Sequence, residues 1–156
     1  MPASPLSYCL SLLKRRLRSR WELDQAMERR GFERDARLVV LDQLEKQGLV
    51  NDRQFALAWV HTRDRLAPRG EFVLRNELRG KGVAEEIIAG VLRERKEEAA
   101  DPEEEQPSEL ELARELVKRR QRGYERLPAD TRRRRIAALL QRRGFSMDTI
   151  RRILNA

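Results

Sequence analysis

The sequence predicts an all-α fold built from three tandem three-helix repeats. Three observations predict it: a short motif recurs three times in the 156 residues, apolar residues recur at helical spacing, and strand-like runs of β-branched and aromatic residues are absent. Charged residues make up 38% of the chain and aromatic residues 5%, which suits a small helical core and argues against a β-sandwich or barrel. Because small repeats stack on their neighbours, we expect an elongated molecule that can be curved.

The recurring motif is the end of one helix, a glycine turn and the start of the next helix, centred on Gly31, Gly82 and Gly144. Apolar residues align without gaps eight and four positions before the glycine, and nine and ten positions after it. In that order they are Leu23, Leu74 and Ile136; Met27, Leu78 and Leu140; Val40, Val91 and Ile153; and Leu41, Leu92 and Leu154. Residues four positions apart share a helix face, and glycine closes a helix in a left-handed conformation. The motif therefore predicts a corner between two helices, filled by the residue that follows each glycine.

A further helix precedes each copy of the motif. Its apolar residues recur at helical spacing, as in Leu10, Leu13 and Leu17, in Phe55 and Trp59, and in Leu112 and Leu116. Ser19 and Ser108 each begin an S-x-x-E capping box, and Asn51 can begin a helix in a similar way. The sequence thus predicts nine helices in three repeats, at residues 7–50, 51–98 and 108–156. Residues 99–107 are acidic and hold two prolines, so they are predicted to form a solvated linker.

Composition excludes several classes of site. A single cysteine, Cys9, and a single histidine, His61, exclude an internal disulfide and the usual Cys/His zinc sites. No segment approaches the roughly 20 apolar residues of a membrane span, and the first basic residue is Lys14, unlike a secretory signal. No nucleophile motif accompanies His61, and Cys9 is predicted to be a buried, unreactive thiol. We therefore expect a cytoplasmic protein that is not an enzyme and uses no cofactor or metal.

Two segments carry a resemblance to a known family. Residues 49–56 read Leu-Val-Asn-Asp-Arg-Gln-Phe-Ala and are followed by Trp59-Val60, Arg63, Arg69-Gly70, Glu77-Leu78 and Lys81-Gly82-Val83. Residues 140–146 read Leu-Gln-Arg-Arg-Gly-Phe-Ser and are followed by Asp148 and Ile150. In this order the segments resemble the RecX family, over about residues 7–98 and 109–156. The chain departs from the pattern in its longer acidic linker and in Arg37, which stands where the other repeats have Ile88 and Ile150.

The resemblance implies both a fold and a function. Members of the family are small all-helical proteins made of tandem three-helix repeats. They bind the RecA–DNA filament, inhibit its recombinase, ATPase and coprotease activities, and are not enzymes. This implication makes a RecA filament the expected partner of the chain, which we expect to be a monomer.

The net charge of +8 is concentrated in the last repeat, where residues 109–156 hold 14 basic and 6 acidic side chains. Helical geometry places Arg134, Arg135 and Arg142 away from the apolar stripe of the same helix. Four consecutive arginines in the first turns of a helix oppose its dipole, so a purely structural helix gains nothing from them. This face is either a solvated surface or a binding site for a polyanion or an acidic protein groove. Arg119 and Arg120 lie nearby in the sequence, and Lys14, Arg15 and Arg18 form a smaller basic cluster in the first repeat.

Two aromatic residues are predicted to point away from the core. Trp21 and Phe72 both stand ten positions before their glycine, where the third repeat has Arg134. This position faces about 160° from the core stripe. Two explanations remain open at this point: packing against an adjacent helix or repeat, and contact with a partner.

Two functions compete. The first is a filament modulator that lies along the helical groove of RecA and contacts several protomers through its repeats. The alternative is a stand-alone DNA-binding protein that uses a helix-turn-helix element, in contact with single- or double-stranded DNA. The helix that would read bases in the second repeat begins Ala84-Glu85-Glu86. This start weighs against the alternative, because its two acidic residues repel phosphates.

Overall fold

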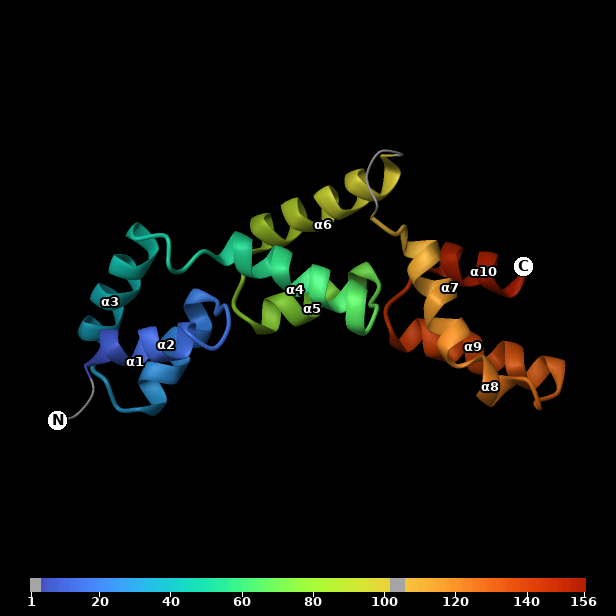
Figure 1. Ribbon diagram of the computed structural model, residues 1–156, viewed down its shortest axis with the longest axis horizontal. Helices are drawn as coiled ribbons and strands as arrows, with labels where there is room; N and C mark the ends of the chain where they lie inside the picture. The colour runs from blue at the N-terminus through green and yellow to red at the C-terminus, as the bar shows by residue number, and fades with distance from the viewer. Residues whose placement is uncertain (1–3, 102–105) are drawn as a thin grey trace. The chain divides into compact units, whose positions relative to one another are not determined.

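The computed structural model describes residues 4–101 and 106–156, and every regular element in these ranges is a helix. Figure 1 shows the helices in chain order. They are α1 (Pro5–Leu13), α2 (Arg20–Arg29), α3 (Arg34–Lys46), α4 (Asp52–Leu66), α5 (Glu71–Gly80), α6 (Glu85–Ala100), α7 (Glu109–Arg119), α8 (Gln121–Tyr124), α9 (Ala129–Arg142) and α10 (Met147–Leu154). The all-α prediction is confirmed. The described ranges hold ten helices rather than nine, because the four-residue α8 stands between α7 and α9.

The described chain packs into two compact units. The first extends to Ala58 and includes Leu78–Ile88, and the second comprises Trp59–Glu77 and the chain from Ala89 onward. Helices α4, α5 and α6 of the second repeat each contribute residues to both units. Helix α6 continues to Ala100, two residues into the linker predicted at residues 99–107. Residues 102–105 of that linker lie outside the described residues.

The core of the first repeat lies between α1, α2 and α3, which Figure 1 shows packed together. It contains all four residues of this repeat that the motif predicted, together with other apolar side chains. The buried members are Cys9, Leu23, Met27, Val40, Leu41, Leu44 and Val50. Phe32, the residue after the capping glycine, packs against this cluster as predicted.

Arg37 replaces an apolar residue without leaving a buried charge unpaired. Its guanidinium lies 2.9 Å from the Asp24 carboxylate and 3.3 Å from the Glu28 carboxylate. It also donates a hydrogen bond to the Phe32 carbonyl at 3.2 Å. Ion pairs and a hydrogen bond to the corner thus take the place of the apolar packing expected from Ile88 and Ile150.

The core of the third repeat is formed by α7, α9 and α10. The buried members are Leu112, Ala113, Leu116, Leu139, Leu140, Phe145 and Ile150. The Glu109 carboxylate in the first turn of α7 accepts hydrogen bonds from the Ser146 hydroxyl at 2.8 Å and the Thr149 hydroxyl at 2.7 Å. This network joins the start of α7 to the start of α10 and adds to the N-cap that Ser146 itself supplies.

The helix ends match the predicted caps. Ser19 and Ser108 both form complete capping boxes, and the Asn51 side chain accepts a hydrogen bond from the Gln54 amide at 3.0 Å. The three repeat glycines have left-handed backbone angles, with φ of 83° at Gly31, 71° at Gly82 and 79° at Gly144. A side chain with a Cβ resists this conformation, so each motif requires glycine at its turn.

Candidate partner-binding surface

The start of α2 lies against the turn between α5 and α6 (joint 1). The Ser19 hydroxyl donates a hydrogen bond to the Lys81 carbonyl at 2.6 Å. The Lys81 ammonium lies 3.0 Å from the Glu22 carboxylate, which also pairs with Arg16 at 3.0 Å. A Cβ built on Gly82 would lie 2.2 Å from the Cβ of Trp21, so the helix start and the turn are in direct contact.

The start of α5 lies in the same way against the turn between α9 and α10 (joint 2). The Gly70 amide donates a hydrogen bond to the Arg143 carbonyl at 2.7 Å. A Cβ on Gly70 would lie 1.9 Å from the Gly144 carbonyl oxygen, and a Cβ on Gly144 would lie 2.6 Å from a Val73 methyl. Glycine is required at both positions because the two backbones approach so closely.

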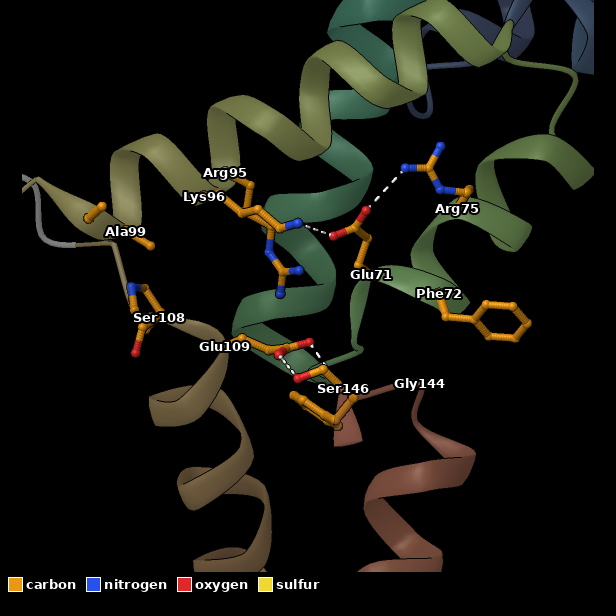
Figure 2. A pocket seen from close by; sticks show the side chains of 13 residues that line it. Glu71, Phe72, Arg75, Arg95, Lys96, Ala99, Ser108, Glu109, Gly144 and Ser146 are labelled. Carbon is orange, nitrogen blue, oxygen red and sulfur yellow. Dashed lines mark hydrogen bonds and ion pairs between the residues drawn. The ribbon is translucent and has the colours of Figure 1, made fainter. Parts of the chain in front are cut away.

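The two aromatic candidates differ in their surroundings. Trp21 contacts Gly82 at joint 1 and keeps 44% of its surface exposed. Phe72 is 69% exposed, and Figure 2 shows its ring directed away from the neighbouring Glu71 side chain. The helix start that carries Trp21 is thus engaged within the chain, whereas the Phe72 ring is available to solvent or a partner.

Residues that carry the family resemblance form a polar network between α4 and α5. The Trp59 indole donates a hydrogen bond to the Glu77 carboxylate at 2.8 Å, and Arg63 donates to the same carboxylate at 3.0 Å. The Arg63 guanidinium also stacks 4.7 Å from the centre of the Trp59 ring. Arg69 pairs with Glu77 at 3.6 Å. Trp59 is therefore half-buried within this network, whereas Phe55, one turn earlier on the same helix, is fully part of the buried core.

The predicted basic face of α9 is exposed. Arg134, Arg135 and Arg142 are all exposed, whereas Leu139 and Leu140 of the same helix are buried. The Arg134 side chain donates to the Asp130 carbonyl at 3.3 Å. Within the described residues, no hydrogen bond or ion pair engages Arg135 or Arg142. Three guanidinium groups on one sector of a helix can bind an acidic surface or phosphates without first breaking a strong internal ion pair.

The other basic candidates lie in different settings. Arg119 pairs with Glu115 at 3.3 Å and donates to the Leu66 carbonyl at 3.5 Å, and Arg120 is exposed at the C-cap of α7. Lys14 and Arg15 are exposed at the end of α1. Arg18 is half-buried, and its Nε is a buried atom without a hydrogen-bond partner among the described residues.

A cavity of about 740 Å³ lies beside joint 2 (Figure 2). The Glu71 carboxylate in its wall lies 2.5 Å from Lys96 and 3.1 Å from Arg75. The hydrogen bond from Lys96 and the nearby Arg75 outweigh partial burial and hold the pKa of Glu71 below its ordinary value. A third cation, Arg95, forms a bidentate ion pair with the Asp64 carboxylate, with N–O distances of 2.9 and 2.7 Å. Each of these charged groups is thus engaged in an ion pair, Arg95 with a carboxylate outside the cavity lining.

The Cys9 thiol is fully buried, and its burial raises its pKa to about 11. The thiolate that reacts with oxidants and electrophiles is therefore scarce at neutral pH. The described residues hold no group of three or more His, Cys, Asp and Glu side chains arranged to bind a metal ion. Among the same residues, no helix is long and apolar enough to cross a membrane.

Glu22 makes the stability of joint 1 dependent on pH. Burial opposes its charged form, but hydrogen bonds from Arg16 and Lys81 outweigh burial and hold its pKa below the ordinary value. The stabilisation is therefore present above the pKa of an unfolded glutamate, about 4.3, and is lost as the pH falls through the lower folded pKa. We expect Glu22→Gln to lower the free energy of unfolding by about 1 to 2 kcal/mol at pH 7.

Urea unfolding of Glu22→Gln and the unmodified chain between pH 7 and pH 3 measures this contribution. The difference in unfolding free energy between the two chains should shrink toward the acid end. A difference that stays constant, or grows, on acidification would show that the charge of Glu22 does not stabilise the joint.

Comparison with known proteins identifies the family. Three domain models match the chain in order: RecX, first three-helix domain, at residues 6–44; RecX, second three-helix domain, at 51–92; and RecX, third three-helix domain, at 108–154. The matches span most of the chain. The chain belongs to the RecX family. The tandem arrangement of three three-helix domains, predicted from the glycine motif, is thereby confirmed.

RecX proteins of several bacteria are similar to this chain along most of its length. The Regulatory protein RecX of Amycolatopsis mediterranei is 36% identical over 137 residues, which cover 88% of this chain and 73% of that protein. The Regulatory protein RecX of Streptomyces coelicolor is 37% identical over 138 residues, which cover 88% and 69%. The family is one of regulatory proteins rather than enzymes, as the resemblance implied.

Two solved structures share the fold. The crystal structure of RecX from Lactobacillus salivarius has a TM-score of 0.78 at 21% identity and covers 97% of this chain and 92% of that one. A second crystal structure, of regulatory protein RecX, has a TM-score of 0.81 at 23% identity and covers 97% and 72%. The RecX fold therefore extends over nearly the whole chain.

Sequence reasoning missed the residues of the two joints. Ser19 was recognised as a helix cap and Gly70 as part of a family motif, but neither was predicted to contact another repeat. One signal was available in the alignment, because both residues stand twelve positions before their glycine and both are small. Pairing of Glu22 with Lys81 carried no such signal, since joint 2 has Val73 at the position of Glu22.

Proposed function

We propose that this RecX-family chain binds RecA–DNA filaments and inhibits their recombinase, ATPase and coprotease activities. The observation that carries the proposal is the ordered match of all three RecX domains, together with regulatory relatives aligned over 88% of the chain. Such a partner is met in the bacterial cytoplasm, where the chain acts as a monomer.

The exposed arginines of α9 are the proposed contact with the filament. Arg134, Arg135 and Arg142 are exposed on α9, whereas Leu139 and Leu140 of the same helix are buried, and the net charge of the third repeat favours an acidic groove. Secondary contacts are proposed at Arg119, Arg120, Lys14, Arg15 and Arg18, and at the aromatic side chains of Trp21 and Phe72. Binding one state of the filament better than another shifts the filament toward that state, which inhibits activity without any chemical step.

Direct DNA binding through a helix-turn-helix element is the second candidate. The basic charge of the third repeat favours it, since cations on one face bind phosphates of single- or double-stranded DNA. The helix starts that would read bases weigh against it. Glu85 at the start of α6 pairs with Arg79 at 2.8 Å, and Ser146 before α10 bonds to Glu109. These groups are committed to the fold and place carboxylates where a recognition helix needs to meet phosphates.

Charge reversal tests the α9 surface. The triple variant Arg134→Glu, Arg135→Glu, Arg142→Glu is expected to weaken filament binding by roughly tenfold or more, because attraction is lost and repulsion is added. Since binding by cations weakens as salt rises, the variant should also show a shallower salt dependence than the unmodified chain. Both effects are measured by titrating each protein into a RecA-driven strand-exchange reaction at several salt concentrations and recording the concentration that inhibits it by half.

A matched control separates the surface from total charge. Arg29→Glu, Arg34→Glu, Lys46→Glu changes the charge by the same amount on exposed residues of the first repeat. It is expected to inhibit nearly as well as the unmodified chain. If the α9 variant stays folded and inhibits as well as this control, the α9 face is only a solvated surface.

A further inference from the structure

Joints 1 and 2 use the same repeat positions in two separate units of the molecule. Ser19 and Gly70 both stand twelve positions before their repeat glycine, and Lys81 and Arg143 both directly precede the glycine of the next repeat. In each joint, a donor on the residue before the second helix binds the carbonyl that precedes the next glycine, at 2.6 and 2.7 Å. The donor differs, a hydroxyl in one case and a backbone amide in the other, but the connection is the same.

Among the described residues, this contact occurs only between one repeat and the next. A Cβ on Gly31 would meet nothing within 4 Å among the described residues, whereas Gly82 and Gly144 are in close contact with the preceding repeat. The third repeat has Arg132 at the position of Ser19. Its amide is used inside α9, where it donates to the Pro128 carbonyl at 2.9 Å. The joint therefore belongs to the connection between repeats and is not a general feature of the three-helix fold.

We propose that Ser19 and Gly70 are positioning residues, which hold each repeat against the next so that neighbouring repeats engage the filament together. The inference rests on the proposed function. When one repeat has bound, a joined neighbour meets its own contact at a high effective concentration, and weak contacts add to a tight one. A larger side chain at Gly70 collides with the Gly144 carbonyl and separates the repeats, while the helix caps and cores of each repeat stay intact.

Gly70→Ala tests joint 2, and Gly80→Ala is its matched control. Neither glycine has a left-handed φ, and a Cβ on Gly80 meets nothing within 4 Å of the described residues. Spin labels on Asn76→Cys and Gln141→Cys, both exposed, in a Cys9→Ala background report the distance across the joint. We expect a narrow distance distribution for the parent chain and for Gly80→Ala, and a broad one for Gly70→Ala. We expect filament affinity to fall at least tenfold only in Gly70→Ala.

Ser19→Asn tests joint 1 independently. Asparagine is as good an N-cap as serine. Its side chain is larger, however, and does not fit the fully buried position where the Ser19 hydroxyl contacts the Lys81 carbonyl. Ser4→Asn, at the exposed cap of α1, is the control. Filament affinity is expected to fall in Ser19→Asn and not in Ser4→Asn, with the helical circular dichroism of both unchanged.

The outcomes separate the two proposals. A narrow distance distribution in Gly70→Ala, or a broad one combined with unchanged affinity in both joint variants, overturns the positioning role while leaving filament binding by the parent chain intact. A parent chain that does not bind filaments overturns the proposed function itself, whatever the distance measurement shows.

Discussion

Replacing Gly144 by valine is expected to lower the free energy of unfolding of the third repeat by about 4 kcal/mol. Two costs add up. A β-branched residue at φ of 79° is strained by about 1 to 3 kcal/mol. The new side chain also has no room, because a Cβ at this position lies 2.7 Å from the Val73 backbone nitrogen, and such overpacking costs a further 1 to 3 kcal/mol or so.

Gly31→Val is the comparison that separates the two costs. Its φ of 83° imposes the same strain, but a Cβ there meets nothing within 4 Å in the described chain. The expected loss is therefore about 1 to 3 kcal/mol, the strain alone. Urea unfolding followed by circular dichroism measures both variants. Equal losses would show that Gly144 is needed only for its backbone angle and that joint 2 contributes nothing to stability.

Leu140→Ala is expected to lower the free energy of unfolding by about 3 kcal/mol, within the range of 2 to 5 kcal/mol typical of a large-to-small change in a core. Leu140 is fully buried in the core of α7, α9 and α10, so the shortened side chain leaves a cavity. Ile136 is the matched residue one turn earlier, and it is only half-buried against the same core. Ile136→Ala should therefore cost about half as much.

This pair tests whether the repeat positions are energetically equivalent. The alignment places Ile136 with Leu23 and Leu74, both of which are fully buried. Thermal unfolding of the two variants gives the comparison. If Ile136→Ala is as costly as Leu140→Ala, the third repeat buries this position in solution as deeply as the other two repeats do.

Local signals were sufficient to predict the helices and their corners. The glycines at positions 31, 82 and 144 adopt the left-handed angles that their place at the ends of helices predicted, and both predicted capping boxes form. These features depend on residues within four positions of one another, so the sequence contains all the information. The short α8 was missed because four residues are too few to show a helical period.

Contacts between distant residues were not predictable in the same way. The Gly70 amide reaches the Arg143 carbonyl, and Lys81 reaches Glu22, across more than fifty residues in each case. No periodicity connects such pairs, and each residue had a sufficient local explanation as a cap or as part of a family motif. Arg37 gives a further case, because only the structure places Asp24 and Glu28 within ion-pair distance of it.

The basic face of α9 could be predicted only in part from the sequence. Helical geometry predicted that Arg134, Arg135 and Arg142 point away from the core, and the structure exposes all three. Arg119, grouped with them by sequence, instead contacts Glu115 and the Leu66 carbonyl. Charge counts alone cannot distinguish a cation that is free to bind a partner from one that supports the fold.

Binding of the unmodified chain to three targets at matched salt distinguishes a filament modulator from a DNA-binding protein. The targets are RecA filaments assembled on single-stranded DNA, the same DNA without RecA, and double-stranded DNA. We expect the chain to bind the filament more tightly than either bare DNA, and to inhibit strand exchange at concentrations that leave bare DNA unbound. Binding to bare DNA as tight as binding to the filament, or no binding to the filament, would contradict this expectation.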